Sequence, residues 1–281
     1  MSGMRIRHRR PLFYLVVSVF WSLFINPTWG QAKSDLDRFD LQGSVRTVVT
    51  KYPQLTTAQQ FDREGHLTTF ELLPGHETHS AVRYVYRYDE TGRLAEEETF
   101  EPNGTVSYRK LFRYGLDQQG RPSAQVAVTD QGLFAQAEFS FYDRRGLLAE
   151  DIMVTAQGVT EKSLYDARGN LIYHARYFQR RLVLEATHHY DPADRLNESR
   201  FYGGDGELMR RDHYRYDQAG HRLEQSSDYV RQSHLRKSVV TYEFDPAGNW
   251  IKETAQRWSQ KDGSAGLTET VVSRERTITY Y

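Results

Sequence analysis

The fold is decided by one short stretch, Tyr165-Asp166-Ala167-Arg168-Gly169-Asn170-Leu171, which the chain repeats. Clear copies of the stretch begin at Phe61, Tyr88 and Tyr142, and weaker copies begin at Tyr190, Tyr216 and Phe244. A self-similar period of this kind is the signature of a repeat protein. The repeat therefore predicts an architecture, and it does not by itself predict a reaction.

The Asp-x-x-Gly core of each copy predicts a tight hairpin turn. Asp is favoured at the first position of a type I turn, and Gly at the fourth position adopts the left-handed conformation of a G1 bulge. Pro192 and Pro246 fit the second position, and Asp194 stands where one copy lacks its glycine. The predicted structural turn residues are Asp62, Gly65, Asp89, Gly92, Asp117, Gly120, Asp143, Gly146, Asp166, Gly169, Asp191, Asp194, Asp217, Gly220, Asp245 and Gly248.

The outer residues of the repeat predict cross-strand pairs on one face of the sheet. With the bulge counted, the residue before Asp lies opposite the residue two after Gly, and aromatic–aliphatic pairs contribute roughly 0.2–1 kcal/mol each. The predicted pairs are Phe61–Leu67, Tyr88–Leu94, Phe100–Val106, Tyr142–Leu148, Tyr165–Leu171, Tyr190–Leu196 and Phe244–Trp250. The copies at Tyr114 and Tyr216 depart from this spacing, so we expect irregular or shifted hairpins there.

The spacing of the turns predicts an all-β fold. Successive major turns lie about 25 residues apart, which leaves room for two strands per unit. No long apolar stripe with a helical period interrupts them. We expect an antiparallel meander of repeated β-hairpins, some sixteen strands long, forming one curled or spiral elongated sheet with Tyr and Leu inside and Arg, Glu and Gln outside. A short lead-in over 35–43 precedes a first strand over 44–52.

The N-terminus predicts secretion. Four arginines precede a short apolar run over 11–25 and a small-residue region, so 1–32 is predicted to be a signal peptide, with cleavage after Ala32 or after Gly30. The remaining 33–281 form a single repeat domain, clearest over 61–250, with a formal charge of −4 and no cysteine. We expect a periplasmic or cell-surface protein with no disulfide, no affinity for nucleic acid and no membrane span after cleavage.

The recurring Tyr-Asp-x-x-Gly-x-Leu pattern resembles the RHS/YD-repeat family of secreted and surface bacterial proteins. The resemblance covers about 61–250. It implies β-hairpin units that spiral into a sheet, which in large members closes into a hollow shell around a C-terminal toxin. This chain is too short for such a shell, so it looks like a small stand-alone secreted member.

Several residues suggest chemistry, but each has a structural explanation. His188 and His189, near Asp191, point to opposite faces of a strand and cannot chelate together. Gly203-Gly204-Asp205-Gly206 is a single copy of a pattern that binds calcium only in stacked copies. Glu96-Glu97-Glu98 with Asp89 suggests a glycoside hydrolase pair, but such runs are usually solvated strand edges. We predict no catalytic residues, no metal site and no cofactor.

The sequence therefore favours a secreted, non-enzymatic binding or scaffold module of the bacterial envelope, with a protein or glycan as its ligand. An accessory or relic of a toxin-delivery RHS system is one alternative, and a hydrolase is another. Tyrosines together with Trp250 and Trp258 could stack against sugars. Whether the aromatic face is a filled core or an open groove, and whether the sheet needs a partner to cover its edges, stays open at this stage.

Overall fold

The computed structural model describes residues 35–39, 41–75, 81–218, 220–230, 234–261 and 268–281, and the predicted signal peptide lies outside them. A short helix, α2 (Asp35–Arg38), precedes one 18-stranded antiparallel sheet. The strands are β1 (Val45–Lys51), β2 (Leu55–Phe61), β3 (Leu67–Pro74), β4 (Val82–Tyr88), β5 (Leu94–Phe100), β6 (Val106–Leu116), β7 (Pro122–Thr129), β8 (Phe134–Tyr142), β9 (Leu148–Thr155), β10 (Gly158–Tyr165), β11 (Leu171–Phe178), β12 (Arg181–Tyr190), β13 (Leu196–Gly203), β14 (Leu208–Tyr216), β15 (Arg222–Tyr229), β16 (His234–Phe244), β17 (Trp250–Lys261) and β18 (Thr268–Tyr280).

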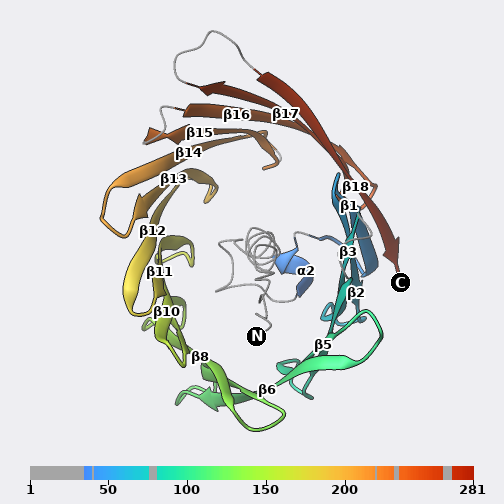
Figure 1. The fold of residues 1–281 in the computed structure, drawn as a ribbon, viewed down its shortest axis with the longest axis vertical. Helices are drawn as coiled ribbons and strands as arrows, with labels where there is room; N and C mark the ends of the chain where they lie inside the picture. The colour runs from blue at the N-terminus through green and yellow to red at the C-terminus, as the bar shows by residue number, and fades with distance from the viewer. Residues whose placement is uncertain (1–34, 40, 76–80, 219, 231–233, 262–267) are drawn as a thin grey trace, which may run out of the picture.

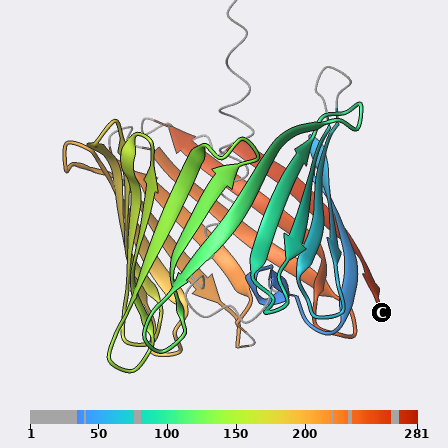
Figure 2. The same ribbon diagram turned by 90° about the horizontal axis from the view of Figure 1, so that it is seen from below.

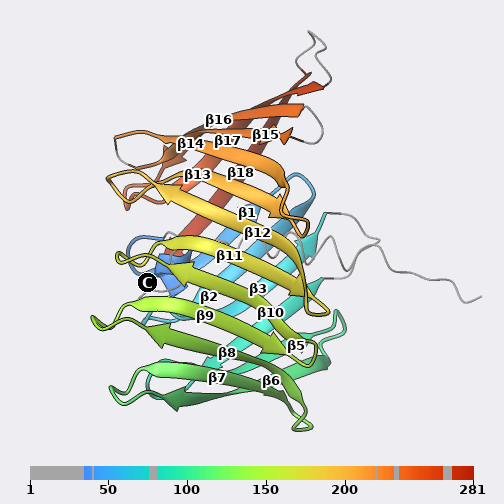
Figure 3. The same ribbon diagram turned by 90° about the vertical axis from the view of Figure 1, so that its left-hand side faces the viewer.

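The sheet closes into a barrel. Each strand pairs with the next along the chain, and β18 pairs with β1, where Val48 lies opposite Ile278 and Thr50 opposite Arg276. Figure 1 shows the resulting ring, and Figures 2 and 3 show the strands tilted across its wall. The meander prediction is confirmed, but the curled or spiral open sheet is wrong. Closure pairs both edge strands, so neither edge needs a partner to cover it.

The repeat turns have the predicted local geometry. In the turn at Asp166, the N–H of Gly169 donates to the Asp166 carbonyl at 3.0 Å, and the N–H of Asp166 donates to the Asn170 carbonyl at 2.9 Å. Gly169 has a φ of 88°, and Asp194, in the glycine position of its own turn, has a φ of 59°. The same two backbone bonds recur in all eight repeat turns, each of which begins with an aspartate. Because the chain is a meander, all eight turns lie at one end of the barrel.

The predicted cross-strand pairs all form, but one lies on the other face. Phe100 pairs with Val106 at the opposite end of the barrel and lies on the outer wall with Arg83, so the prediction of a single shared face is wrong for this pair. At Tyr114 the hairpin is regular, contrary to expectation: Leu116, directly before Asp117, pairs with Pro122 across the same bulge that the other repeat turns carry.

The hairpin at Tyr216 is regular, contrary to expectation. Arg222 faces Tyr216 across the same bulge that the other repeat turns carry. The late position of Leu223 therefore changes which side chain faces the tyrosine and leaves the register unchanged.

The short helix α2 lies inside the ring and identifies the inner wall (Figure 1). Phe39, just after α2, packs edge-on against Phe61 at 5.9 Å between ring centroids, so the aromatic–aliphatic face of β2 points inward. The buried apolar residues on this side of the barrel form the core, joined by Leu36, Phe39, Tyr84, Tyr86 and Ile278. The buried members are Leu41, Val45, Val48, Phe61, Leu67, Phe70 and Leu72.

The strand register extends the inner face around the whole ring. Residues that lie directly opposite each other in adjacent strands share a face. Following the pairs from Tyr86 and Glu97 strand by strand returns to Gln59 and Phe70 on the same face. From β8 to β18 this inner face is largely polar and charged, which corrects the expected arrangement of Tyr and Leu inside with charges outside.

Candidate functional site

The repeat aspartates are occupied by their own turns. Oδ1 of Asp143 accepts the N–H groups of Arg145 and Leu147, at 2.8 and 3.0 Å, and Oδ2 accepts the Arg145 guanidinium. The Leu147 N–H, the Arg145 side chain and the Arg145 N–H hold the pKa of Asp143 below its usual range. The repeat carboxylates are already hydrogen-bonded within their own turns, so they are poorly placed to transfer protons or to bind a metal.

The residue directly after Gly connects neighbouring turns, and sequence reasoning missed it. Arg195 binds Asp191 through Nε at 2.8 Å, donates through Nη1 to the Asp217 carbonyl at 3.0 Å, and lies 5.3 Å from the centroid of the Tyr216 ring. Arg93 and Arg121 repeat this stacking on the tyrosines of their next repeats. The signal was present, because seven of the eight residues in this position are Arg, His or Asn.

The repeat tyrosines add a second connection between hairpins. The Tyr190 hydroxyl donates to the Leu171 carbonyl at 2.9 Å, and the Tyr216 hydroxyl donates to the Leu196 carbonyl at 2.8 Å. Tyr88, Tyr114 and Tyr142 make the equivalent bond to the preceding repeat. A phenylalanine would fill the same space without this bond, so the hydroxyl explains the preference for tyrosine.

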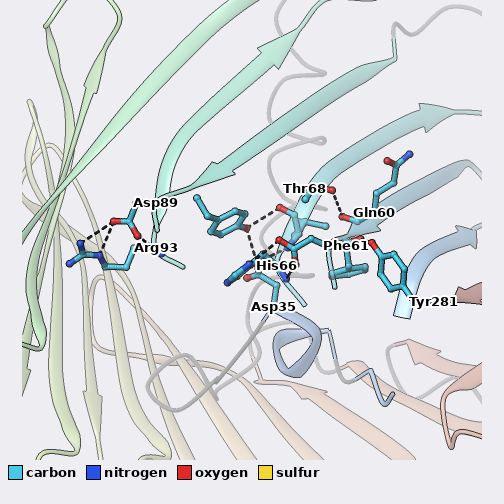
Figure 4. A network of polar contacts seen from close by, with 11 residues as sticks. Asp35, Gln60, Phe61, His66, Thr68, Asp89, Arg93 and Tyr281 are labelled. Atoms are coloured by element: carbon cyan, nitrogen blue, oxygen red, sulfur yellow. Dashed lines mark hydrogen bonds and ion pairs between the residues drawn. The ribbon is translucent and has the colours of Figure 1, made fainter. Parts of the chain in front are cut away.

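Asp35 anchors α2 to the inner wall (Figure 4). Its Oδ2 accepts the Leu67 N–H at 2.8 Å and the Tyr88 hydroxyl at 2.7 Å, and the residue is 9% exposed. The His66 ring stacks on Tyr88 at 4.5 Å and also binds Asp62. One buried carboxylate thus joins the helix, the first repeat turn and the second repeat tyrosine.

A cleft of about 500 Å³ lies beside Tyr281. Its polar groups bind one another: Thr47 and Thr279 share a 2.6 Å hydrogen bond, and Thr68 donates to the Gln60 carbonyl at 3.1 Å. The Tyr281 hydroxyl donates to the Phe61 carbonyl at 2.6 Å (Figure 4). The hydroxyl groups that line the cleft are therefore already hydrogen-bonded.

The inner wall of β8–β11 is acidic. Glu138, Asp151 and Glu161 share the inner face with one arginine, Arg176, whose Nε lies 3.6 Å from Glu161 Oε1. Burial raises the pKa of Glu161 to about 7, with Glu138 adding to the shift and Arg176 opposing it. Burial also raises the pKa of Asp151.

A row of small polar residues crosses the inner wall from β12 to β15. His188, Ser199, Asp212 and Ser227 lie directly opposite one another in successive strands, and His188 Nδ1 lies 2.9 Å from Ser199 Oγ. Burial lowers the pKa of His188 to about 4. The serine stands between the histidine and the aspartate and is 1% exposed, so the row lacks both the order and the access of a catalytic triad.

The inner wall of β14–β18 is basic. Two of its arginines are held by buried acids: Arg210 Nε lies 3.1 Å from Asp212, and Arg274 Nε lies 3.0 Å from Glu253. Among the side chains that the structure describes there, five arginines stand against these two carboxylates. They are Arg210, Arg222, Arg257, Arg274 and Arg276.

The outer wall carries ion pairs along the strands. Arg87 binds Glu96 at 3.0 Å and Glu98 at 2.8 Å, and Lys162 binds Glu150 at 2.8 Å. Within the run Glu96-Glu97-Glu98, considered above as part of a hydrolase pair, only Glu97 faces inward. There it binds Lys110 at 2.9 Å. The run is therefore divided between the two faces, and each of its carboxylates is paired with a cation.

The remaining candidates from the sequence are also placed. His189 lies opposite Glu198 on the outer face, away from His188. A Cβ on Gly204 would lie 2.1 Å from the Leu182 carbonyl oxygen, so this glycine serves close backbone contact. No three His, Cys, Asp or Glu side chains gather to hold a metal within the described residues. In the same part of the chain, no helix is long and apolar enough to cross a membrane.

Comparisons with known proteins give little guidance on function. A family model described only as an uncharacterised protein matches residues 112–245, and no curated protein matches the chain. Among solved structures, a porin-like protein from Bacteroides uniformis is 11% identical, with a TM-score of 0.48 and coverage of 85% of this chain and 99% of the other.

Two other similar solved structures are crystal structures of TcdB2-TccC3. TcdB2-TccC3-TEV is 14% identical, with a TM-score of 0.35 and coverage of 84% of this chain and 16% of the other. TcdB2-TccC3 without its hypervariable C-terminal region is 13% identical, with a TM-score of 0.27 and coverage of 77% and 15%. At these low scores the architecture rests on this chain's own strand pairing, and the RHS/YD likeness stays one of sequence motif.

Proposed function

We propose that this protein is a secreted, non-enzymatic binding or scaffold barrel of the bacterial envelope that takes a protein or glycan ligand. The observation that supports it best is the accessible polar inner wall. The side chains of Arg176 and Arg210 keep 36% and 33% of their surface exposed although both face inward. The inner wall away from α2 is therefore open to solvent, as in other barrels with this many strands.

The placement in the envelope rests on the predicted signal peptide at 1–32 and on the charged outer wall. An Arg or Lys on the lipid face of a barrel costs about 2–4 kcal/mol near the bilayer midplane. Arg87 and Lys162 are ion-paired on that wall, so we propose that the barrel stands in water. After cell fractionation it should leave the membranes in an alkaline carbonate wash, and retention by the washed membranes would contradict this placement.

The proposal that the protein is not an enzyme rests on how its acids and serine are used. The turn carboxylates are bonded within their turns, and Ser199 is fully buried. The competing hydrolase hypothesis would need two inner acids, such as Glu138 and Glu161, to act together. Turnover of a glycoside that disappears in Glu161→Gln would favour the hydrolase over the binding barrel.

The alternative as an accessory of a toxin-delivery system rests on the repeat geometry. Eight Asp-led hairpins with one shared turn are what the RHS/YD resemblance leads one to expect of a small stand-alone member. In that case the neighbouring genes should encode a toxin, an immunity protein or a secretion component. Neighbours of unrelated function in several genomes would remove this alternative.

Binding itself is tested with the mature chain. We expect saturable binding to at least one glycan on an array or to one purified envelope protein. An outer-wall variant, Arg215→Gln, should bind as the parent does, because Arg215 is 78% exposed and faces away from the lumen. Saturable binding to none of these ligands would contradict the proposal.

A further inference from the structure

The charges on the inner wall are separated across the barrel. The acidic inner wall of β8–β11 carries Glu138, Asp151 and Glu161. The five inner arginines lie on β14, β15, β17 and β18. Figure 1 places β8 and β10 across the ring from β17 and β18. A concave surface lined by one sign of charge concentrates the field and attracts ligands of the opposite sign. The chain's nearly balanced overall charge hides this separation.

We propose that the basic inner wall of β14–β18 binds an acidic oligosaccharide through its carboxylate or sulfate groups. The inference deepens the proposed binding function and rests on it. Buried Asp212 and Glu253 form ion pairs with Arg210 and Arg274 on the wall. Beyond these two pairs, the wall also carries Arg222 and Arg257.

Arg257 is the more accessible of these two. It is exposed, faces inward opposite Ser238, and forms no ion pair with any side chain that the structure describes. A guanidinium offers a planar fork of donors that matches carboxylate and sulfate oxygens. Adjacent strands lie about 4.8 Å apart, so arginines on several strands suit a ligand that repeats its anionic group.

The way the arginines meet the aromatic rings favours a glycan over a nucleic acid. The Arg276 guanidinium lies 3.6 Å from the centroid of the Trp250 ring, and the Arg210 guanidinium lies 4.0 Å from that of Phe201. Binding of single-stranded nucleic acid depends on free aromatic faces against which bases stack. A guanidinium group covers one face of each of these two rings, so that face is not free for a base to stack against.

The test is titration of the mature chain with four probes by calorimetry at low and high salt. The probes are hexagalacturonate, a heparin hexasaccharide, neutral maltohexaose and a short oligothymidylate. We expect one of the two acidic oligosaccharides to bind, with an affinity that falls as salt rises. Arg257→Gln combined with Arg222→Gln should weaken this binding at least tenfold, whereas the outer-wall Arg215→Gln should not change it.

The other outcomes overturn the inference in different ways. Equal binding of maltohexaose, or equal loss in Arg215→Gln, leaves the proposed binding function standing without the basic wall as its site. Tighter binding of oligothymidylate that Arg257→Gln abolishes would assign the wall to nucleic acid. Binding of an envelope protein alone refutes the glycan and keeps the wider proposal. Should the double variant unfold, Arg257→Glu alone serves, because the side chain is exposed.

Discussion

Replacing Asp166 with alanine should cost stability and leave ligand binding unchanged. Oδ1 accepts the N–H groups of Arg168 and Asn170 at 2.8 and 2.9 Å, and Oδ2 accepts the Asn170 amide at 3.2 Å. A net hydrogen bond is worth about 0.5–1.5 kcal/mol, and water reaches this half-exposed turn. We therefore expect a loss of about 1–2 kcal/mol, since water replaces part of what is removed.

The assay is urea unfolding followed by circular dichroism, with thermal melting as a check. A loss of that size should lower the Tm by about 2–8 °C in a chain of this length. Asp166→Asn keeps an oxygen that accepts both N–H groups, so it should lose about half as much. Glu90→Ala changes an exposed acid at the second position of another repeat turn and should be neutral.

The pH dependence supplies a second readout for the same carboxylate. Desolvation opposes the shift, but the N–H groups of Asn170 and Arg168 lower the pKa of Asp166 in the folded state. Its contribution is therefore present above about pH 4, the unfolded pKa, and is lost as pH falls through the folded pKa. The reasoning is refuted if Asp166→Ala unfolds at the same urea concentration as Glu90→Ala at pH 7.

Three further predictions address the rim, the helix anchor and the acidic wall. Arg195→Lys should melt below the parent and close to Arg195→Ala, because a lysine cannot bind Asp191, reach the Asp217 carbonyl and stack on Tyr216 together; a parent-like Tm for the lysine variant would contradict this. Asp35→Ala should destabilise by about 2 kcal/mol by leaving the Leu67 N–H without its acceptor, and hydrogen exchange at that amide should accelerate; unchanged exchange would show that α2 is not anchored there. Burial raises the pKa of Glu161 to about 7, so its favourable contribution is complete below about pH 4 and is lost as pH rises through 7. Glu161→Gln should therefore gain on the parent in Tm between pH 5 and pH 8, and a constant difference across that range would contradict the assignment.

The turns and the cross-strand pairs could be predicted because their determinants are local. Asp166, Gly169 and Leu171 lie within one hairpin, and their spacing alone fixes a bulge and a register. Phe100–Val106 was assigned to the wrong face because its turn lies at the other end of the barrel, where the alternation of faces is the reverse of that at the repeat turns.

Closure could not be predicted from the sequence for the opposite reason. Val48 and Ile278 meet across nearly the whole chain, and nothing near either residue indicates a partner. Whether a meander spirals or closes depends on strand number, tilt and stagger acting together. The separation of charges on the inner wall depends in turn on closure, since β8 and β18 face each other only in a ring. The connecting role of Arg195 was readable in principle, because the position after Gly is polar in almost every repeat.

The central claim is that β1 and β18 pair and close the barrel, and a cysteine crosslink tests it most directly. Thr47 and Thr279 lie directly opposite on the outer face, with their hydroxyl oxygens 2.6 Å apart, and the natural chain has no cysteine. Paired strand residues lie within the distance that a disulfide spans. Thr47→Cys with Thr279→Cys should oxidise to a monomer of altered gel mobility that reverts on reduction, while Thr47→Cys with Thr254→Cys should not. An open spiral sheet would leave the first pair reduced or yield only crosslinked dimers, and that result would contradict the closed barrel.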